Sequence, residues 1–533
     1  MKNIIFVLLV LFVFTGCKQT PKNEQNTSEN VDVVYSEEEL YRPEFHFTPK
    51  KAWMNDPNGM FFYNGYYHLY FQYYPDGNVW GPMHWGHAIS TDMVTWVEKP
   101  IALFPDEKGY IFSGSAVVDA NNTSGFGKGG KIPIVAMFTY HNMEKEKQGD
   151  IDFQSQAIAY SLDEGLTWEK YADNPVIKNP NIKDFRDPKI VWDAVNEKWI
   201  MVLAAGNKVM LYGSKNLKDW TFLSNFGENI GSQDGVWECP DLFALQTEGT
   251  NEIKWVLLVS VGSGGYNEGS ATQYFVGDFD GITFKIDPTF KNDLGSNHAS
   301  WIDYGKDNYA GVTWSNIPAT DGRKLFIGWM SNWQYATKVP TEKWRSSMTV
   351  ARELKLMKTD NQYRLMSLPV KEISNYVSKI VNKNSINIEK GKPTLLTNKT
   401  LVNFKSLDIH FKIKNLKEDI YTFYFDNKGG DSIKFGVNNE DKFFFIDRTG
   451  SGNISFSKDF APNISKAPYT ANGSDLEVRL LFDKTSIEIF YNKGETVMTE
   501  IFFPKSPIEA LSVQSENFNF EIENLIINEL NFN

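Results

Sequence analysis

A turn motif recurs along the chain at intervals of roughly 50 to 70 residues, and this repeat limits the folds open to it. Residues 90–96 read Ser-Thr-Asp-Met-Val-Thr-Trp, and residues 161–168 and 214–220 share the same serine and tryptophan ends. Residues 277–284 form a degenerate fourth copy, and a fifth unit without the motif extends from about residue 301 to residue 329. Strand-like runs precede the four copies, at 65–74, 132–140, 198–205 and 254–261. Four short strands per repeat predict an all-β chain with a five-bladed β-propeller; a barrel does not predict this spacing.

The sequence changes in character beyond Leu356. Lysine and asparagine become more frequent, tryptophan is absent after Trp344, and the strand runs become shorter and alternate in polarity. This pattern predicts a C-terminal antiparallel β-sandwich. We therefore expect a propeller at 41–355, a connecting segment at 356–385 and the sandwich at 386–533.

The N-terminus carries the features of an export signal. Lys2 precedes eleven apolar residues at positions 4–14, a run too short to span a bilayer. Thr15-Gly16-Cys17 resembles a bacterial lipobox, which predicts a signal peptide at 1–16, lipidation of Cys17 and a polar tether at 17–40. The expected protein is exported and anchored to a bacterial membrane, periplasmic or surface-exposed, through this lipid alone. Ordinary cleavage near Gly16 with a free Cys17 is the alternative.

The net charge and the cysteine content argue against a nucleic-acid partner and against disulfide bonds in the folded domains. The 54 basic and 66 acidic residues give a net charge of −12 without a basic block, which argues against a nucleic-acid partner. Cys239 is the single cysteine beyond Cys17, so no disulfide forms within the folded domains. The 15 tryptophans and 24 tyrosines suit stacking on sugars, or packing in a β-rich core.

Four segments at predicted blade starts carry the candidate chemistry. They are Trp-Met-Asn-Asp-Pro-Asn-Gly at 53–59, Phe-Ser-Gly-Ser at 112–115, Phe-Arg-Asp-Pro at 185–188 and Trp-Glu-Cys-Pro-Asp at 237–241. The first strand of each blade begins at the central channel, so Asp56, Asp187 and Glu238 are expected to converge there. Acids grouped with an arginine and tryptophans, without a metal-ligand cluster or cofactor motif, are typical of glycoside cleavage.

Two other motifs are interpreted as structural. His84 and His87 are three residues apart in a predicted strand, which places their side chains on opposite faces and argues against a metal site. Cys239 follows Glu238 directly, so we expect it to point away from the acids and to fill a small space in the core.

These motifs together resemble glycoside hydrolase family 32, the group of invertases, inulinases, levanases and fructosyltransferases. The resemblance implies a five-bladed propeller followed by a β-sandwich. It makes Asp56 the nucleophile, Asp187 the transition-state stabiliser and Glu238 the general acid/base of a retaining mechanism. It also implies a fructose pocket formed by Asn55, Gln72, Trp80 (or Trp85 in its place), Phe112, Ser113 and Arg186.

The expected substrate is a fructan, levan or inulin, with sucrose as a further candidate, and fructose is expected to leave from the chain end. Internal cleavage and transfer of fructose to a sugar acceptor stay open. So do an inverting glycosidase for arabinan or xylan and a fructan-binding surface lipoprotein without catalysis. The sequence leaves the oligomeric state undecided and predicts a structural role for the sandwich.

Overall fold

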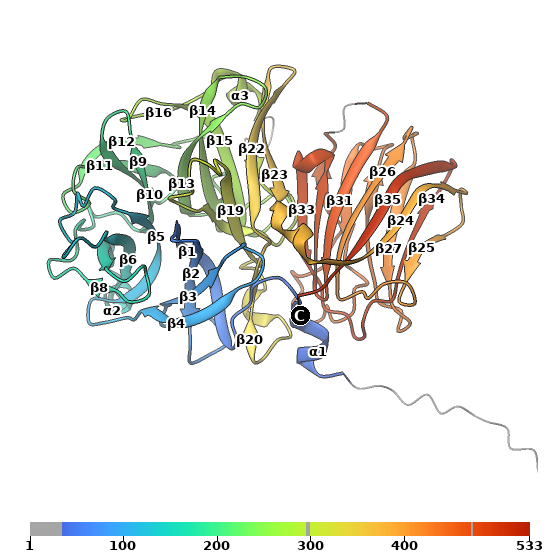
Figure 1. Ribbon diagram of the computed structural model, residues 1–533, viewed down its shortest axis with the longest axis horizontal. Coiled ribbons are helices and arrows are strands. Elements are labelled where there is room, and N and C mark those ends of the chain that lie inside the picture. The colour runs from blue at the N-terminus through green and yellow to red at the C-terminus, as the bar shows by residue number, and fades with distance from the viewer. Residues whose placement is uncertain (1–34, 295–298, 471–472, 533) are drawn as a thin grey trace, which may run out of the picture. The chain divides into compact units, whose positions relative to one another are not determined.

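The computed structural model describes residues 35–294, 299–470 and 473–532, and strands make up about half of it (Figure 1). The predicted signal peptide, Cys17 and the tether as far as residue 34 lie outside the described residues. In the described part of the chain, no helix is long and apolar enough to cross a bilayer. The short helices are α1 (Glu37–Tyr41), α2 (Met143–Gln148), α3 (Pro288–Asp293), η1 (Ala336–Lys338), η2 (Lys371–Tyr376) and η3 (Asn492–Gly494).

Five antiparallel sheets of the described residues form the N-terminal domain, one sheet for each blade. Blade 1 consists of β1 (Ala52–Tyr63), β2 (Tyr66–Tyr74), β3 (His84–Ser90) and β4 (Val97–Leu103); blade 2 of β5 (Tyr110–Val118), β6 (Ile134–His141), β7 (Gln154–Ser161) and β8 (Glu169–Lys170); blade 3 of β9 (Phe185–Asp193), β10 (Lys198–Ala205), β11 (Val209–Ser214) and β12 (Thr221–Phe226). Blade 4 consists of β13 (Trp237–Gln246), β14 (Ile253–Val261), β15 (Ala271–Phe279) and β16 (Phe284–Ile286), with β17 (Ser300–Trp301) beside β15; blade 5 of β18 (Tyr309–Thr313), β19 (Lys324–Met330), β22 (Arg352–Thr359) and β23 (Gln362–Pro369), with β21 (Ser347–Met348) beside β19.

The blades close into a ring. Neighbouring inner strands touch in the order β1, β5, β9, β13 and β18, and β18 also touches β1. The short strand β20 (Trp344–Arg345) pairs in parallel with the start of β1, where Ala52 lies opposite Trp344. A segment from the end of the domain is thus bonded to its first blade, and the predicted five-bladed propeller is confirmed.

The repeated turn motif has a common structural basis. In each of the first three copies the serine hydroxyl accepts a backbone N–H from two or three residues ahead: Ser90 from Met93 at 2.7 Å, Ser161 from Asp163 at 3.3 Å and Ser214 from Leu217 at 2.9 Å. One residue of each turn adopts a left-handed conformation: Met93, Glu164 and Leu217. The serine therefore satisfies backbone donors that the tight turn leaves without strand partners.

The predicted boundary between the domains is wrong. Strands β22 and β23, as far as Pro369, complete the sheet of blade 5, and β24 (Val377–Ile388) already belongs to the sandwich. The connecting segment is therefore only 370–376, most of it η2. The prediction from composition after Leu356 was wrong because the outer strands of blade 5 alternate between buried and partly buried residues, as sandwich strands also do.

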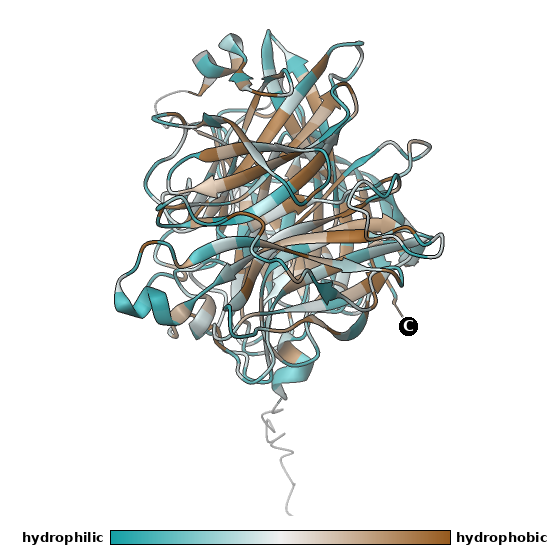
Figure 2. Ribbon diagram, turned by 90° about the vertical axis from the view of Figure 1, so that its left-hand side faces the viewer, coloured by the Kyte–Doolittle hydropathy of each residue, from teal (hydrophilic) through white to brown (hydrophobic). Residues whose placement is uncertain are grey.

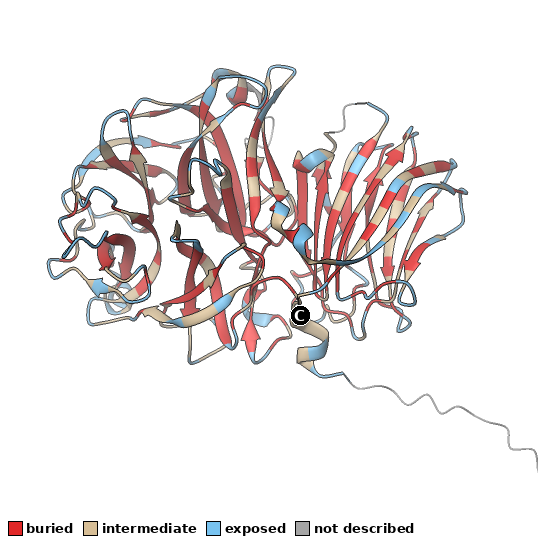
Figure 3. Ribbon diagram, in the orientation of Figure 1, coloured by how far each residue is buried: buried red, intermediate tan, exposed pale blue. Residues whose placement is uncertain are grey.

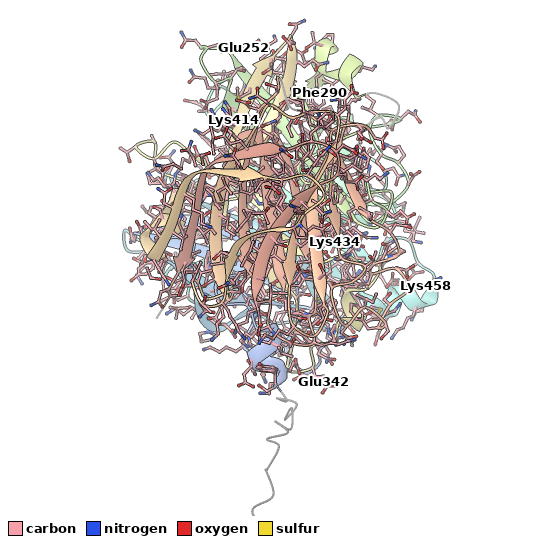
Figure 4. The ribbon with its side chains drawn as sticks, turned by 90° about the vertical axis from the view of Figure 1, so that its right-hand side faces the viewer. Glu252, Phe290, Glu342, Lys414, Lys434 and Lys458 are labelled. Atoms are coloured by element: carbon pink, nitrogen blue, oxygen red, sulfur yellow. The ribbon has the colours of Figure 1, made fainter. Side chains whose placement is uncertain are left out.

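The C-terminal domain is the predicted β-sandwich. One sheet has the order β24, β35 (Phe520–Leu530), β26 (Ser406–Lys414), β31 (Leu476–Asp483), β32 (Ser486–Tyr491) and β33 (Thr496–Ile501). The other has the order β25 (Thr394–Asn398), β34 (Ala510–Ser515), β27 (Ile420–Asp426), β28 (Ser432–Asn438), β29 (Phe443–Asp447) and β30 (Ser465–Pro468). Phenylalanines fill the space between the sheets, with the rings of Phe425 and Phe482 stacked at 4.2 Å. Lys414 and Lys434 carry their charges on the outside, on the side of the molecule shown in Figure 4.

Apolar residues line the strands and polar residues the connections (Figure 2), and buried strands occupy the interior of both domains (Figure 3). The contact between the domains, in contrast, contains buried charges. Glu488 of β32 accepts hydrogen bonds from Arg352 of blade 5, from the ring of His46 and from the backbone of Val350. All of these groups are buried, so the ion-paired network depends on both domains being in place.

Candidate active site

Every inner strand of the propeller carries an irregularity close to its first residues. The pairing register shifts between Met54 and Pro57 in β1, and at the corresponding place in β5, β9, β13 and β18. Asp187, Cys239 and Ala310 lie in three of these bulges and have positive φ angles of 65°, 45° and 53°. A bulge adds a residue to one strand and redirects the side chains beside it. The bulges therefore turn side chains of all five blades toward one end of the channel.

Asp56 lies in the bulge of β1, and donors from two strands hold its carboxylate. Ser113 Oγ of β5 donates to Oδ2 at 2.7 Å, and Asn55 Nδ2 donates to Oδ1 at 3.0 Å. Asn55 is itself oriented by the Trp53 indole N–H, at 2.7 Å. Burial, and secondly the negative charge of Glu238, raise the pKa of Asp56 above its usual value.

Asp187 is 5% exposed and belongs to the bulge of β9. Its Oδ2 accepts the backbone N–H of Cys239 at 3.1 Å, and Arg186 Nε lies 3.9 Å away. Burial raises the pKa of Asp187 to about 7, although the nearby Arg186 guanidinium opposes that shift. Repulsion from Glu238 and Asp56 adds to the rise in pKa.

Glu238 is held by two donors from neighbouring blades. Arg186 of blade 3 donates to its Oε1 through Nε at 3.2 Å and Nη2 at 2.9 Å, while Nη1 binds Asp184 at 2.7 Å. The Tyr309 hydroxyl of blade 5 donates to Oε2. The structure thus brings the three predicted acids together: Glu238 shares Arg186 with Asp187, and its charge acts on Asp56.

The prediction that Cys239 points away from the acids is wrong. Its thiol lies 3.5 Å from Asp56 Oδ2 and 3.7 Å from Asp187 Oδ2, between the two carboxylates. Alternation along an ideal strand would separate the side chains of Glu238 and Cys239, but the bulge and the positive φ of Cys239 break that alternation. Burial and the surrounding carboxylates raise the pKa of the Cys239 thiol well above its usual value.

Aromatic rings lie at the start of β5, where Phe112 directly precedes the Ser113 that binds Asp56. Trp80 is half-buried and meets the Phe112 ring edge-on at 6.0 Å, and Phe112 stacks on His141 at 4.1 Å. Trp85, considered in exchange for Trp80, is fully buried and donates its indole N–H to the Phe112 carbonyl. Of the two tryptophans, Trp80 therefore has the ring that a ligand can reach.

Gln72 has a different position from the other predicted pocket residues. It is buried, and its amide nitrogen donates to Asn58 Oδ1 at 2.8 Å and to the Ile111 carbonyl at 3.0 Å. In the described part of the chain, its hydrogen bonds go to Asn58 and Ile111 and to none of the three acids. Gln72 links β2 to the start of β5 and supports the strands that carry Asp56 and Phe112.

The sequence interpretation missed Tyr309, Asp184 and His141. Tyr309 opens the inner strand of blade 5, so its position at a blade start was the available signal. Asp184 lies directly before the Phe-Arg-Asp-Pro motif, and nothing in the sequence separates it from an ordinary turn residue. His141 ends β6 and stacks on Phe112, and the charges of Arg186 and Asp184 act on its ring.

The described residues contain no group of three His, Cys, Asp or Glu side chains that could hold a metal ion. His84 Nδ1 contacts the Pro82 carbonyl, whereas His87 stacks on Tyr70 inside blade 1, so the two histidines lie in different surroundings. The site is therefore a set of carboxylates, an arginine and a tyrosine beside accessible aromatic rings. Such a set can supply a nucleophile and a proton donor to a glycosidic bond.

Comparison with known proteins gives a consistent result. The family model for the glycosyl hydrolases family 32 N-terminal domain matches residues 46–369, and that for the family 32 C-terminal domain matches residues 372–529. A levanase of Bacillus subtilis is 44% identical over 528 residues, 99% of this chain and 74% of the levanase. An extracellular exo-inulinase of Aspergillus awamori is 39% identical over 89% of this chain and 92% of its own length.

Solved structures show the same fold. The crystal structure of the exo-inulinase from Aspergillus awamori has a TM-score of 0.83 at 35% identity, covering 93% of this chain and 99% of its own. A fructofuranosidase from Schwanniomyces occidentalis complexed with fructose has a TM-score of 0.82 at 35% identity, covering 94% and 100%.

Proposed function

Because the chain belongs to glycosyl hydrolase family 32, we propose that it hydrolyses the β-D-fructofuranosyl linkages of levan or inulin, releases fructose from the chain end, and also accepts sucrose. The observation that carries this proposal is the convergence of Asp56, Asp187 and Glu238 at one end of the channel. Release from the chain end is supported by the relatives named exo-inulinase.

In the proposed reaction, Asp56 attacks the anomeric carbon of the terminal fructosyl unit. Glu238 gives a proton to the departing glycosidic oxygen, so the electron pair of the broken bond leaves on a neutral hydroxyl group. Glu238 then removes a proton from water, which attacks the same carbon and releases Asp56. Two displacements at one carbon retain its configuration.

The contacts around the acids support these roles. Ser113 and Asn55 fix the Asp56 carboxylate from one side, which orients an oxygen for attack. Arg186 and Tyr309 hold the Glu238 side chain by both of its oxygens. Asp187, beside Arg186, would face the positive charge that develops on the sugar ring. Trp80 and Phe112 would pack on the sugar, while Asn55, Ser113 and Arg186 bind its hydroxyl groups.

Asp56→Asn and Glu238→Gln test this assignment because both variants keep the shape of the side chain. We expect each to fold normally, as circular dichroism would show, and to lose at least ~1,000-fold in kcat on sucrose and inulin. Near-normal turnover in either variant would contradict the assignment and would favour a fructan-binding protein whose chemistry is elsewhere.

Product analysis tests the remaining parts of the proposal. Chromatography of digests of levan, inulin and sucrose should show fructose as the sole early product from both polymers, whereas a ladder of oligosaccharides would indicate internal cleavage. Addition of methanol should yield methyl β-D-fructofuranoside, since a retaining enzyme transfers the fructosyl unit on the same face. Oligosaccharides longer than the substrate would identify a fructosyltransferase.

Export and anchoring form a separate part of the proposal, and export is supported by the relatives named extracellular exo-inulinase. Cys17 would carry the lipid and hold the enzyme on a bacterial membrane. Mass spectrometry of the mature N-terminus should find a diacylglyceryl cysteine, and Cys17→Ala should release active protein from membranes. An unmodified N-terminus near Gly16 would support ordinary secretion instead.

A further inference from the structure

The propeller channel has a second mouth, at the opposite end from the three acids. The inner strands β5, β9, β13 and β18 all end there, and a cavity of about 540 Å³ lies between their last residues. Ligand pockets of proteins generally measure ~300–1,000 Å³. Nothing in the proposed reaction uses this cavity.

A buried acid of the cavity lining has hydrogen-bond partners on only one of its two carboxylate oxygens. Asp241 of β13 is 1% exposed, and its Oδ2 accepts from the Thr313 N–H and hydroxyl, each at 2.7 Å, and lies 3.2 Å from Lys189 Nζ. Its Oδ1 is buried and has no hydrogen-bond partner among the described residues. A carboxylate oxygen in that position is costly unless a donor fills the space beside it.

A lysine of the same cavity has no acidic partner within hydrogen-bonding distance. Lys324 of β19 makes no hydrogen bond or ion pair in the described structure, and its ammonium lies 5.2 Å from the centre of the Phe243 ring. Burial lowers the pKa of Lys324, and the charge of Asp241 opposes that shift, so the two groups act on each other across the cavity. Arg323, also in the lining, is already paired with Asp321 and Glu372.

The second mouth is separate from the catalytic end. Between them lies a cavity of about 10 Å³ lined by Asp187, Lys189 and Cys239, with room for about one water molecule. A sugar bound at one end therefore does not pass through the channel to the other.

The chemistry of the lining selects the ligand. The unpaired Asp241 oxygen disfavours an anion, and the ammonium groups of Lys189 and Lys324 disfavour a metal cation. A hydroxyl group can donate to the carboxylate, and a neighbouring hydroxyl can accept from the ammonium. Trp192, half-buried in the lining, offers a ring for the apolar face of such a molecule.

We propose that the cavity at the second mouth binds a small neutral polyhydroxylated molecule, a monosaccharide or a polyol, through Asp241 Oδ1 and Lys324 Nζ. The site is independent of the proposed hydrolysis, since it shares no side chain with the three acids. Fructose, the product of the proposed reaction, would then bind both at the catalytic end and at the second mouth.

Fructose is the probe for this proposal, with crystals of the enzyme soaked in fructose and binding in solution followed by saturation-transfer NMR. We expect electron density for fructose at Asp241 and Lys324, in addition to any in the catalytic site. Lys324→Met keeps the length of the side chain and should weaken binding at the second mouth about tenfold or more. Lys285→Met, which removes an exposed lysine of blade 4, is the matched control and should bind as the parent does.

A second variant tests the same cavity in case Lys324→Met does not fold. Ala244→Trp fills the cavity from an exposed strand position and should also abolish density there, while hydrolysis of sucrose stays at the parental rate in both variants. Water alone at Asp241 in fructose-soaked crystals, or a metal ion in its place, would overturn the proposal. So would equal fructose binding by the parent and both variants.

Discussion

The backbone N–H of Cys239 donates to Oδ2 of Asp187 at 3.1 Å, while the Cys239 thiol lies 3.5 Å from Asp56. The residue that follows Glu238 in the chain thus contacts the other two acids, so the bulge of β13 links all three carboxylates. A change in this bulge would disturb the contacts of Cys239 with both Asp56 and Asp187.

The reactivity of Cys239 should be low. Burial and the nearby carboxylates raise the pKa of the thiol well above its usual value, so the thiolate that reacts with alkylating agents is scarce. We expect iodoacetamide at pH 8 to leave Cys239 unmodified in the folded enzyme and to modify it in urea, as peptide mass spectrometry would show. Rapid labelling of the folded enzyme with loss of activity would show an accessible thiolate.

Asp187→Asn should lower the activity of the enzyme and raise its free energy of unfolding at alkaline pH. The pKa of Asp187 is about 7 when folded against 3.8 as its reference value, so its contribution to stability is largest below pH 4 and is lost as pH rises to 7. The neutral amide escapes this loss. We expect unfolding in urea to cost ~1–3 kcal/mol more for the variant than for the parent at pH 8, with little difference near pH 4. A difference that does not depend on pH would contradict the raised pKa.

Tyr309→Phe should lower kcat by about 10- to 100-fold with a small change in KM, because it removes one of the two groups that hold Glu238. Tyr212→Phe is the matched control, since this buried tyrosine of blade 3 contacts Met210 and lies outside the site. Steady-state kinetics on sucrose would separate the two. Equal kcat values for both variants would show that Arg186 alone suffices to hold Glu238.

The contact between the domains should weaken in alkaline solution. His46 lies 2.8 Å from both Asp483 and Glu488, and these carboxylates raise its pKa to about 9 in spite of burial. A raised histidine pKa gives stability that is complete below about pH 6.5 and is lost as pH rises through 9. We expect up to ~3 kcal/mol of this loss between pH 6.5 and 9.5, and a flatter pH dependence for His46→Gln. Parallel curves for the two proteins would exclude a charged His46.

Much of the propeller could be predicted because each turn motif is a local device: its serine and its left-handed residue lie within a few positions of each other. Likewise, prolines beside Asp56 and Asp187 mark the strand starts. The position of Cys239 could not be predicted, since a bulge replaces the alternation on which strand reasoning depends. The contacts of Tyr309 with Glu238 and of Lys189 with Asp241 join different blades, and only the closed ring brings them together.

The pairing of β20 with β1 has a consequence for the order in which the enzyme is made. Ala52 emerges from the ribosome early, but its parallel partner Trp344 is synthesised only after all five inner strands are complete. A nascent or truncated chain that ends before Trp344 therefore lacks the parallel strand that pairs with the start of β1, the strand that bears Asp56. We therefore expect hydrolytic activity only in chains that extend past Trp344, and none in shorter nascent chains.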